Sequence, residues 1–290
     1  MDKNDSRPPT PLSEDCCGSG CNPCILDVHK KLLEEWEKKK RKNNSPRSEN
    51  ILNQIAYTKF IITKKSQNSA DCILLLLQFN DKTENKQIFL NPGQHIMMQT
   101  NGVSRPFTPI SWGNDYLLFL VKLYKNGKFS EILKLAMVGD IFNIRGPYGD
   151  FLYKLNSYRQ IFIYCIGSGI TAVYPIIKNI VESEVEETKI HLIAGFQTVS
   201  HIPLTKELRT LSDYWNFKCT LHISQKSREN ASIHGIDIVE NHIDKESVYN
   251  LLRYSNPEVT LVLICGTTEF NYFIKECVTE MNHTNIHIFE

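Results

Sequence analysis

The sequence lacks a long apolar run, a large net charge and an even number of cysteines. Its longest apolar stretch near the front, residues 73–77, is far below the ~20 residues of a membrane span, and the polar start lacks the apolar core of a secretory signal. Lys and Arg number 33 against 32 Asp and Glu, so no global field attracts nucleic acid. Nine cysteines is an odd number, and five of them are scattered singly in apolar sequence, which is typical of reduced thiols: Cys72, Cys165, Cys219, Cys265 and Cys277. We therefore expect a cytoplasmic protein, with a mitochondrial one as the alternative, that acts as a monomer without a transmembrane segment or a nucleic-acid partner.

Residues 1–48 differ in composition from the rest of the chain. Residues 1–15 are polar and rich in Pro, Ser and Asp, which predicts disorder. A helix is expected over residues 27–42, where Val28, Leu32 and Trp36 form one apolar stripe. We interpret this region as a small cysteine-rich segment with one helix.

Four thiols lie between the predicted tail and the helix: Cys16, Cys17, Cys21 and Cys24. The two-residue gap between Cys21 and Cys24 is usual for zinc and iron–sulfur ligands, whereas the doubled Cys16-Cys17 is poorer ligand geometry. Three interpretations stay open: a metal site formed by these four residues, a thiol or disulfide redox role, and a docking element whose cysteines only pack.

The remaining sequence has two different patterns of apolar residues. Between residues 50 and 153, short apolar runs alternate with Asn, Asp, Gly and Pro clusters, which predicts an antiparallel β-barrel with strands at 51–62, 72–79, 95–100, 106–111, 117–124 and 141–145 and one helix near residue 130. From 158 to 290, near-continuous apolar runs at 160–166, 189–195, 217–223 and 259–264 alternate with helical stretches at 171–183, 204–213, 245–253 and 268–280. That alternation is typical of a buried parallel sheet in an α/β domain. We predict a two-domain protein with a crevice between barrel and sheet.

Two features of the barrel half are suited to a diphosphate. Arg105 precedes a proline, so its backbone is extended, and a forked guanidinium on a strand can bind a pyrophosphate in bidentate fashion. Lys128, Phe129 and Ser130 open the predicted helix, whose first-turn amides attract anions and whose cap we expect to be Ser130. If the diphosphate belongs to a flavin dinucleotide, Phe107 would stack beside the flavin ring and the Thr108 hydroxyl would hydrogen-bond to that ring.

A glycine turn follows the first strand of the second half. Gly167, Ser168, Gly169 and Thr171 lie between the apolar run 160–166 and a helix, which is the context of a dinucleotide-binding turn. No acidic residue ends the next strand, however, so the turn does not follow the usual NAD-binding pattern. A nucleotide would be held in another way.

Taken together, residues 51–290 resemble the NADH-cytochrome b5 reductase branch of the ferredoxin reductase superfamily. The matching stretches are 105–111, 121–124, 127–130, 145–149, 167–171, 196–198 and Cys265-Gly266. Residues 1–48 resemble the oxidoreductase-like module through Pro8-Pro9, residues 15–17, residues 19–21 and Cys24.

This resemblance implies an oxidoreductase that transfers a hydride from NADH to FAD and then single electrons to a haem acceptor such as cytochrome b5. It implies that FAD is held by Arg105, Pro106, Phe107, Thr108, Lys122, Tyr124, Lys128, Phe129 and Ser130. NADH would lie across Gly167, Ser168, Gly169, Thr171 and Gly266. The implied catalytic residues are Thr108, beside the reactive flavin nitrogen, and Cys265, against the nicotinamide; Phe289 would shield the flavin until nicotinamide arrives.

Departures from the family pattern leave alternatives open. Ile166 stands in the place of a glycine, Ala172 in that of a proline, residues 267–270 replace a proline-rich turn, and Phe107 replaces a tyrosine. The chain could instead be a flavoprotein that reduces the metal or thiols of its own cysteine segment, or a non-catalytic FAD-binding scaffold. Lys226 and Arg228 could favour NADPH, but Ser227-Arg228 lies about three residues later than the ferredoxin reductase pattern, and we prefer NADH. We interpret His95, His191 and His222 as structural histidines with satisfied hydrogen bonds.

Overall fold

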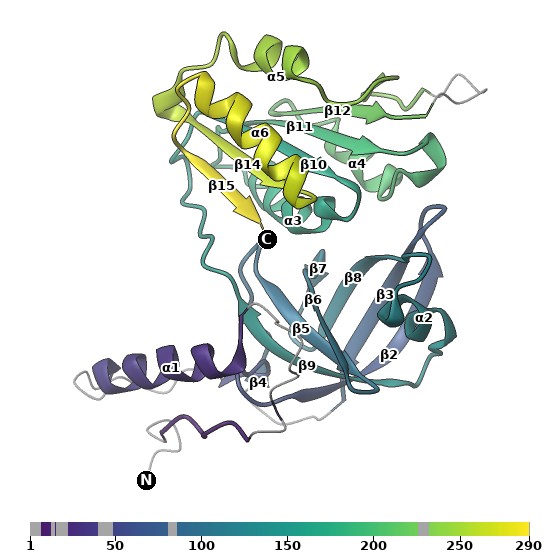
Figure 1. Cartoon of the computed structure of the whole chain (residues 1–290), viewed down its shortest axis with the longest axis vertical. Coiled ribbons are helices and arrows are strands. Elements are labelled where there is room, and N and C mark those ends of the chain that lie inside the picture. Colours follow the sequence, from purple (N-terminus) through teal and green to yellow (C-terminus); the bar gives the residue numbers. More distant parts are fainter. Residues whose placement is uncertain are drawn as a thin grey trace.

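The structure, a computed structural model, describes residues 7–12, 15, 23–39, 49–80, 86–225 and 232–289. It contains a seven-stranded antiparallel sheet, a six-stranded parallel sheet, and a two-stranded pair formed by β1 (Glu49–Asn50) and β4 (Lys86–Gln87). Figure 1 shows the antiparallel sheet curled below the parallel sheet, with the described carboxyl-terminal residues between them. The predicted fold class is confirmed.

The antiparallel sheet has the order β6-β5-β9-β2-β3-β8-β7. Its strands are β2 (Thr58–Gln67), β3 (Cys72–Phe79), β5 (His95–Thr100), β6 (Val103–Phe107), β7 (Ser111–Trp112), β8 (Tyr116–Lys122) and β9 (Ile141–Tyr148). One helix, α2 (Lys128–Leu135), connects β8 to β9. Alternate residues of the strands fill the interior, as Phe60 and Ile62 of β2 and Leu75 and Leu77 of β3 illustrate.

The parallel sheet has the order β13-β12-β11-β10-β14-β15. Its strands are β10 (Gln160–Ile166), β11 (Lys189–Phe196), β12 (Phe217–Ile223), β13 (Asp237–Val239), β14 (Thr260–Cys265) and β15 (Ile286–Phe289). The helices are α3 (Ile170–Val181), α4 (Thr205–Leu211), α5 (Lys245–Leu252) and α6 (Thr268–Glu280).

Both faces of the parallel sheet are covered, which explains its apolar runs. On β10, Ile161 and Ile163 pack with residues of α3 and α4, whereas Phe162 and Tyr164 pack with residues of α5 and α6. A strand buried on both faces has no polar side to alternate with.

The two sheets share one hydrophobic cluster. Ile110 and Leu120 of the barrel half belong to the same buried cluster as Val173 and Ile177 of α3. The crevice between the halves is therefore formed over a packed base, and its two walls face each other at a defined separation.

The amino-terminal helix α1 (Ile25–Lys39) lies beside the barrel, with one end against it and the other projecting away (Figure 1). It begins two residues before the predicted start, and residues 40–42 of the prediction lie outside the described part of the chain. Most of the predicted disordered tail lies outside that part as well.

Two predicted strands differ from the structure by four residues or more at one or both ends, and four others differ by one to three residues. The run 51–62 becomes strand only at Thr58, because the Asn53 side chain accepts hydrogen bonds from the backbone N–H groups of Ile55 (2.7 Å) and Ala56 (2.8 Å) and holds a turn there. The run 106–111 ends its ladder at Phe107, before Pro109, which has no N–H to donate. Strands β13 and β15 are short and were not predicted.

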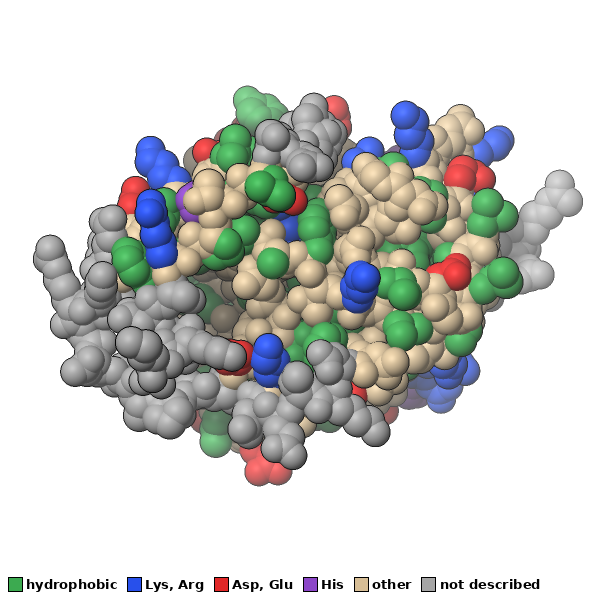
Figure 2. Space-filling model, turned by 90° about the horizontal axis from the view of Figure 1, so that it is seen from below, with side chains coloured by type: hydrophobic (Ala, Val, Ile, Leu, Met, Phe, Trp, Pro, Cys, Tyr) green, Lys and Arg blue, Asp and Glu red, His purple; other side chains and the backbone are tan. Residues whose placement is uncertain are grey.

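Among the described residues, none of the helices is long and apolar enough to cross a bilayer. On the face shown in Figure 2, Lys and Arg side chains are interspersed with Asp and Glu rather than gathered in one patch.

Candidate active site

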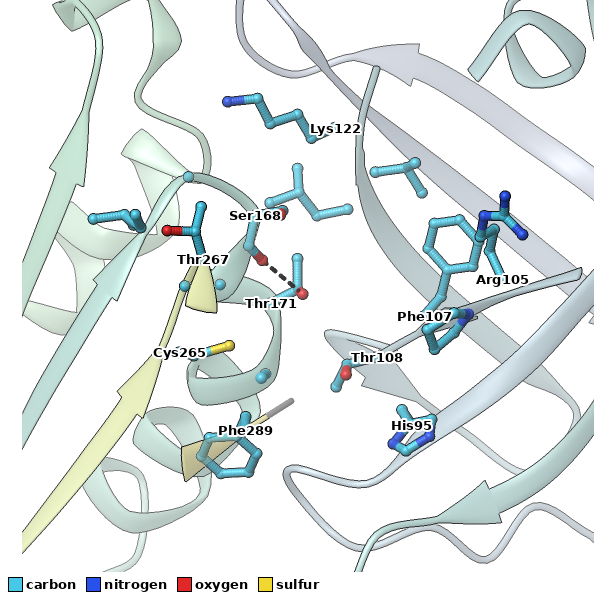
Figure 3. A pocket seen from close by; sticks show the side chains of 18 of the residues that line it. His95, Arg105, Phe107, Thr108, Lys122, Ser168, Thr171, Cys265, Thr267 and Phe289 are labelled. Carbon is cyan, nitrogen blue, oxygen red and sulfur yellow. Dashed lines mark hydrogen bonds between the residues drawn. The ribbon is translucent and has the colours of Figure 1, made fainter. Parts of the chain in front are cut away.

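A cleft of about 1680 Å³ lies between the barrel and the parallel sheet. A pocket for one drug-sized ligand typically has roughly 300–1,000 Å³, so this cleft has room for two extended ligands. Figure 3 shows its two walls, with Arg105, Phe107 and Thr108 on the barrel side and Cys265, Thr267 and Phe289 on the sheet side. All predicted cofactor-binding residues line this one cleft.

Strand β6 supplies the first part of the barrel wall. The Arg105 side chain is exposed, and its Nη1 donates a hydrogen bond to the Ser104 carbonyl (2.7 Å). The Phe107 ring packs on the barrel core, 5.2 Å from the Phe129 ring centroid to centroid. The Thr108 hydroxyl makes no hydrogen bond within the described residues. One short segment therefore contributes a guanidinium, an aromatic ring and a hydroxyl to the lining of the cleft.

The start of α2 supplies the second part, and it corrects one prediction. Ser130 does not cap the helix: the N-cap is Gly127, without a side-chain cap. The Ser130 hydroxyl instead accepts a hydrogen bond from the Tyr124 backbone N–H (2.9 Å), which fixes the turn after β8. Residues 127–130 line the cleft, and no N-cap side chain accepts a hydrogen bond from the first-turn N–H groups of α2. These N–H groups are therefore available as donors to an anion in the cleft.

The end of β8 joins the barrel wall to the glycine turn. The Tyr124 hydroxyl lies 3.0 Å from the Ser168 hydroxyl, and Lys122 Nζ lies 3.2 Å from Asp71 Oδ2. The first contact joins a predicted FAD residue to a predicted NADH residue, and a Cβ on Gly167 would lie 3.4 Å from Lys122 Nζ, so Lys122 also lies beside the glycine turn.

The glycine turn between β10 and α3 requires its glycines. Gly167 has a φ of +53°, which favours glycine. A Cβ on Gly169 would lie 2.1 Å from the Cys265 carbonyl oxygen, so the turn approaches β14 closer than any other residue allows. Thr171 Oγ1 donates a hydrogen bond to the Ser168 carbonyl (2.9 Å), which closes the turn (Figure 3).

Strands β14 and β15 complete the sheet wall. Cys265 and Phe289 are paired residues at the ends of these neighbouring strands. Burial raises the pKa of the Cys265 thiol to about 12, so this residue is a neutral thiol at physiological pH and not a thiolate nucleophile. The Phe289 ring packs against Phe151 (5.4 Å between centroids) and is only partly buried.

The structure explains two departures from the family pattern. The Ile166 side chain fills the space that Gly195 and Gly266 leave, since a Cβ on either glycine would lie within 2.9 Å of it. Thr267 caps α6, because its side chain accepts a hydrogen bond from the Phe270 backbone N–H (3.3 Å). Ile166 and Thr267 therefore have local packing roles at the edge of the cleft.

The charge of the cleft is strongly one-sided. Among its described lining residues, four are cations, Lys31, Arg105, Lys122 and Lys128, and one is an anion, Asp150. All four cations come from the barrel half or α1, and none from the parallel sheet. A cationic wall with free first-turn amides opposite glycine turns fits the diphosphate groups of dinucleotides.

One histidine contradicts its prediction. His191 and His222 are satisfied, by Thr220 (2.9 Å) and Asn241 (2.8 Å). His95 lines the cleft against the Tyr148 ring, burial lowers its pKa, and its Nε2 has no hydrogen-bond partner in the described structure. A lone histidine on an apolar strand gave no signal for this; only the fold brings it to the cleft.

The predicted metal site is described only at Cys24, a partly exposed free thiol. Cys16, Cys17 and Cys21 lie outside the described residues, as do Lys226 and Arg228. The described ranges contain no group of His, Cys, Asp and Glu that could hold a metal ion.

Three families match the chain. Residues 59–153 match "Oxidoreductase FAD-binding domain", residues 163–276 match "Oxidoreductase NAD-binding domain", and residues 4–45 match "Oxidoreductase-like protein, N-terminal". The chain therefore carries the domains for both FAD and NAD.

Individual proteins agree with these matches. The human "NADH-cytochrome b5 reductase-like" protein is 29% identical over 288 residues, which cover 94% of this chain and 90% of that protein. "NADH-cytochrome b5 reductase 1" of Dictyostelium discoideum is 30% identical over 203 residues, 68% of each chain. Among solved structures, the cytochrome b5 reductase domain of Ulva prolifera nitrate reductase has the same fold, with a TM-score of 0.71 at 22% identity, covering 83% of this chain and 100% of that one. The chain is a ferredoxin-reductase-type FAD- and NAD-binding oxidoreductase and belongs to the NADH-cytochrome b5 reductase family.

Proposed function

We propose that this chain takes a hydride from NADH onto FAD and passes electrons singly to a haem protein such as cytochrome b5. The observation that carries the proposal is the two-walled cleft, in which Thr108 on one wall faces Cys265 on the other across open space (Figure 3). Bound FAD supplies the chemistry, since a flavin accepts an electron pair from nicotinamide and releases electrons one at a time.

The barrel wall, within residues 50–153, is our site for FAD. Arg105 and the first-turn amides of α2, with Lys128, would hold the diphosphate as paired and charge-assisted donors. Phe107 would contact the flavin with its ring, which a tilted contact with Phe129 holds in place, and Pro106 keeps the strand extended beside it. Thr108 would donate its free hydroxyl to the flavin ring, while Lys122 and Tyr124 would close the end of the site nearest the glycine turn.

The sheet wall, within residues 158–290, is our site for the nucleotide. Gly167, Ser168, Gly169 and Thr171 would let its backbone pass close to the turn, and Gly266 would do the same at the end of β14. Cys265, a neutral thiol, would position the nicotinamide by soft contact. Phe289 would cover the flavin and yield its place when nicotinamide binds.

We propose NADH rather than NADPH as the donor. A 2′-phosphate requires a cluster of cations at the adenosine end of the nucleotide. The two candidate cations, Lys226 and Arg228, lie outside the described residues, and Ser227-Arg228 comes about three residues later in the sequence than in the ferredoxin reductase pattern.

The test is anaerobic titration of the purified flavoprotein with NADH, followed by addition of oxidised cytochrome b5. We expect NADH to bleach the flavin absorbance and cytochrome b5 then to be reduced in proportion. A flavin that stays oxidised would support the non-catalytic scaffold instead. Bleaching without transfer to any haem protein would overturn the acceptor class.

One observation favours a second acceptor, the thiols of the chain itself. Pro23 lines the cleft, and Cys24 follows it directly. A chain in which Cys16, Cys17, Cys21 and Cys24 are all replaced by serine should reduce cytochrome b5 normally under our proposal. Loss of haem reduction in that variant would favour the thiol or metal route.

A further inference from the structure

Helix α1 lies outside the two sheets but packs on the barrel. Ile25 and Val28 are buried, and Val28 forms a cluster with Met97 of β5 and Tyr148 of β9, against which Leu32 also packs. Met97 is 1% exposed but does not belong to the barrel core. Its neighbours on β5 do belong to that core. The first turns of α1 therefore cover an outer surface of the barrel that would otherwise be apolar and exposed.

The same turns form part of the cleft. Pro23, Val28, Lys31 and Leu32 all line it, and residues 28, 31 and 32 share one face of the helix. The barrel residues nearest to them by packing, Met97 and Tyr148, line the cleft too. The amino-terminal segment is thus a third wall of the cleft, attached to the barrel side.

This third wall brings a cation. Lys31 is exposed and forms no ion pair with any described residue, whereas Lys122, another lining cation, is paired with Asp71. Lys30, its neighbour in sequence, points from a different face of α1 and does not line the cleft. Within the described part of the chain, Lys31 is therefore a cation without an ion-pair partner, and it lines a cleft whose described lining contains one carboxylate.

We propose that α1 completes the FAD site, with Lys31 as a further cation for the diphosphate of the dinucleotide bound on the barrel. This inference rests on the proposed assignment of FAD to the barrel wall. We assign Lys31 to FAD rather than to NADH because the described cluster that α1 joins consists of barrel residues. The amino-terminal segment then has a role in cofactor retention that is independent of its cysteines.

The experiment titrates the full-length apoprotein with FAD and follows the quenching of flavin fluorescence. Lys31→Gln should weaken FAD binding about fivefold, Lys31→Glu should weaken it further, and Lys31→Arg should restore it. Lys30→Glu is the matched control and should bind FAD as the natural chain does. The affinity of Lys31→Gln should also depend less steeply on salt, which a purely structural residue would not affect.

Two further arms separate the possible failures. NADH affinity should be the same in Lys31→Gln and the natural chain; if it weakens while FAD affinity does not, Lys31 serves the nicotinamide nucleotide and the inference is wrong. Unchanged FAD affinity and salt dependence in Lys31→Gln, with weakened binding in Arg105→Ala, would overturn this inference alone. Unchanged FAD affinity in Arg105→Ala would overturn the proposed FAD site itself.

Discussion

The two walls of the cleft differ in charge. The barrel wall presents three of the four lining cations, beside the first-turn N–H groups of α2, whereas the sheet wall presents glycine backbone at 167, 169, 195 and 266 and no described cation. Charge-assisted contacts favour retention, whereas close backbone approach favours shape recognition with weaker attraction. The difference suits one ligand that stays and one that is exchanged in every catalytic cycle.

The strongest way to break the sheet wall is Gly169→Ala. Its Cβ would lie 2.1 Å from the Cys265 carbonyl, so the turn and β14 must separate. We expect NADH-dependent flavin reduction to fall by about a hundredfold or more and the protein to lose roughly 1–3 kcal/mol of stability through overpacking. Stopped-flow reduction and thermal unfolding measure these effects.

Ser168→Ala is the matched control for that change, because it removes only the hydroxyl contact to Tyr124. It should retain most of the reduction rate. Equal rates in Gly169→Ala and the natural chain would show that the nucleotide does not use this turn.

Arg105→Ala, on the barrel wall, has the next largest expected effect, a loss of FAD affinity. Loss of a bidentate cation at a diphosphate should cost about 2–3 kcal/mol, which corresponds to a dissociation constant for FAD roughly 30- to 150-fold higher. Equilibrium titration of the apoprotein measures it, and high salt should reduce the difference between variant and natural chain. Arg159→Ala, outside the cleft lining, is a control that should leave FAD affinity unchanged.

These outcomes bear on how much the sequence alone could reveal. It predicted strands β3, β5, β10 and β12 at their observed bounds, because their apolar runs are long and flanked by turn residues. The residues that the sequence singled out for cofactor binding all line one cleft in the structure, and their cofactor roles stay a prediction. The local sequence pattern was sufficient to predict an element wherever that element's own apolar residues determine which face is buried.

The features of the cleft that the sequence did not predict have a different cause. His95 reaches the cleft only because β5 lies between β6 and β9, and Lys31 only because α1 packs on Met97 and Tyr148. Ser130 resembled a cap from its position, but Gly127 at the N-cap lets its hydroxyl turn back to Tyr124. Each depends on contacts between segments far apart in the chain or on backbone geometry, which periodicity does not record.

The Thr108 hydroxyl tests whether the barrel wall contributes to chemistry as well as to binding. Thr108→Val keeps the shape and removes one donor, so we expect hydride transfer to slow about tenfold while FAD affinity changes little. Single-turnover reduction by NADH measures the rate. Thr63→Val, exposed on β2, is the control; equal slowing in both variants would contradict a role for Thr108.

Replacement of Cys265 has the smallest expected effect, and it tests whether the sheet wall contributes a thiolate to the reaction. Burial raises the pKa of its thiol to about 12, so the thiol stays protonated well above neutral pH. Its titration should leave no inflection in the reduction rate between pH 6 and pH 9, because even the upper end of that range is about three units below this pKa. Cys265→Ser should follow the same pH profile at a rate lowered less than about tenfold. An inflection that disappears in Cys265→Ser would show that a thiolate takes part.

The central claim is that the barrel holds FAD and the sheet holds the nucleotide independently. Its most direct test is a crossed binding measurement, in which Arg105→Ala and Gly169→Ala are each titrated with FAD as apoprotein and with NADH as flavoprotein. The account predicts that Arg105→Ala loses affinity for FAD alone and Gly169→Ala for NADH alone. Equal loss of both ligands in either variant, or the reverse pairing, would contradict it.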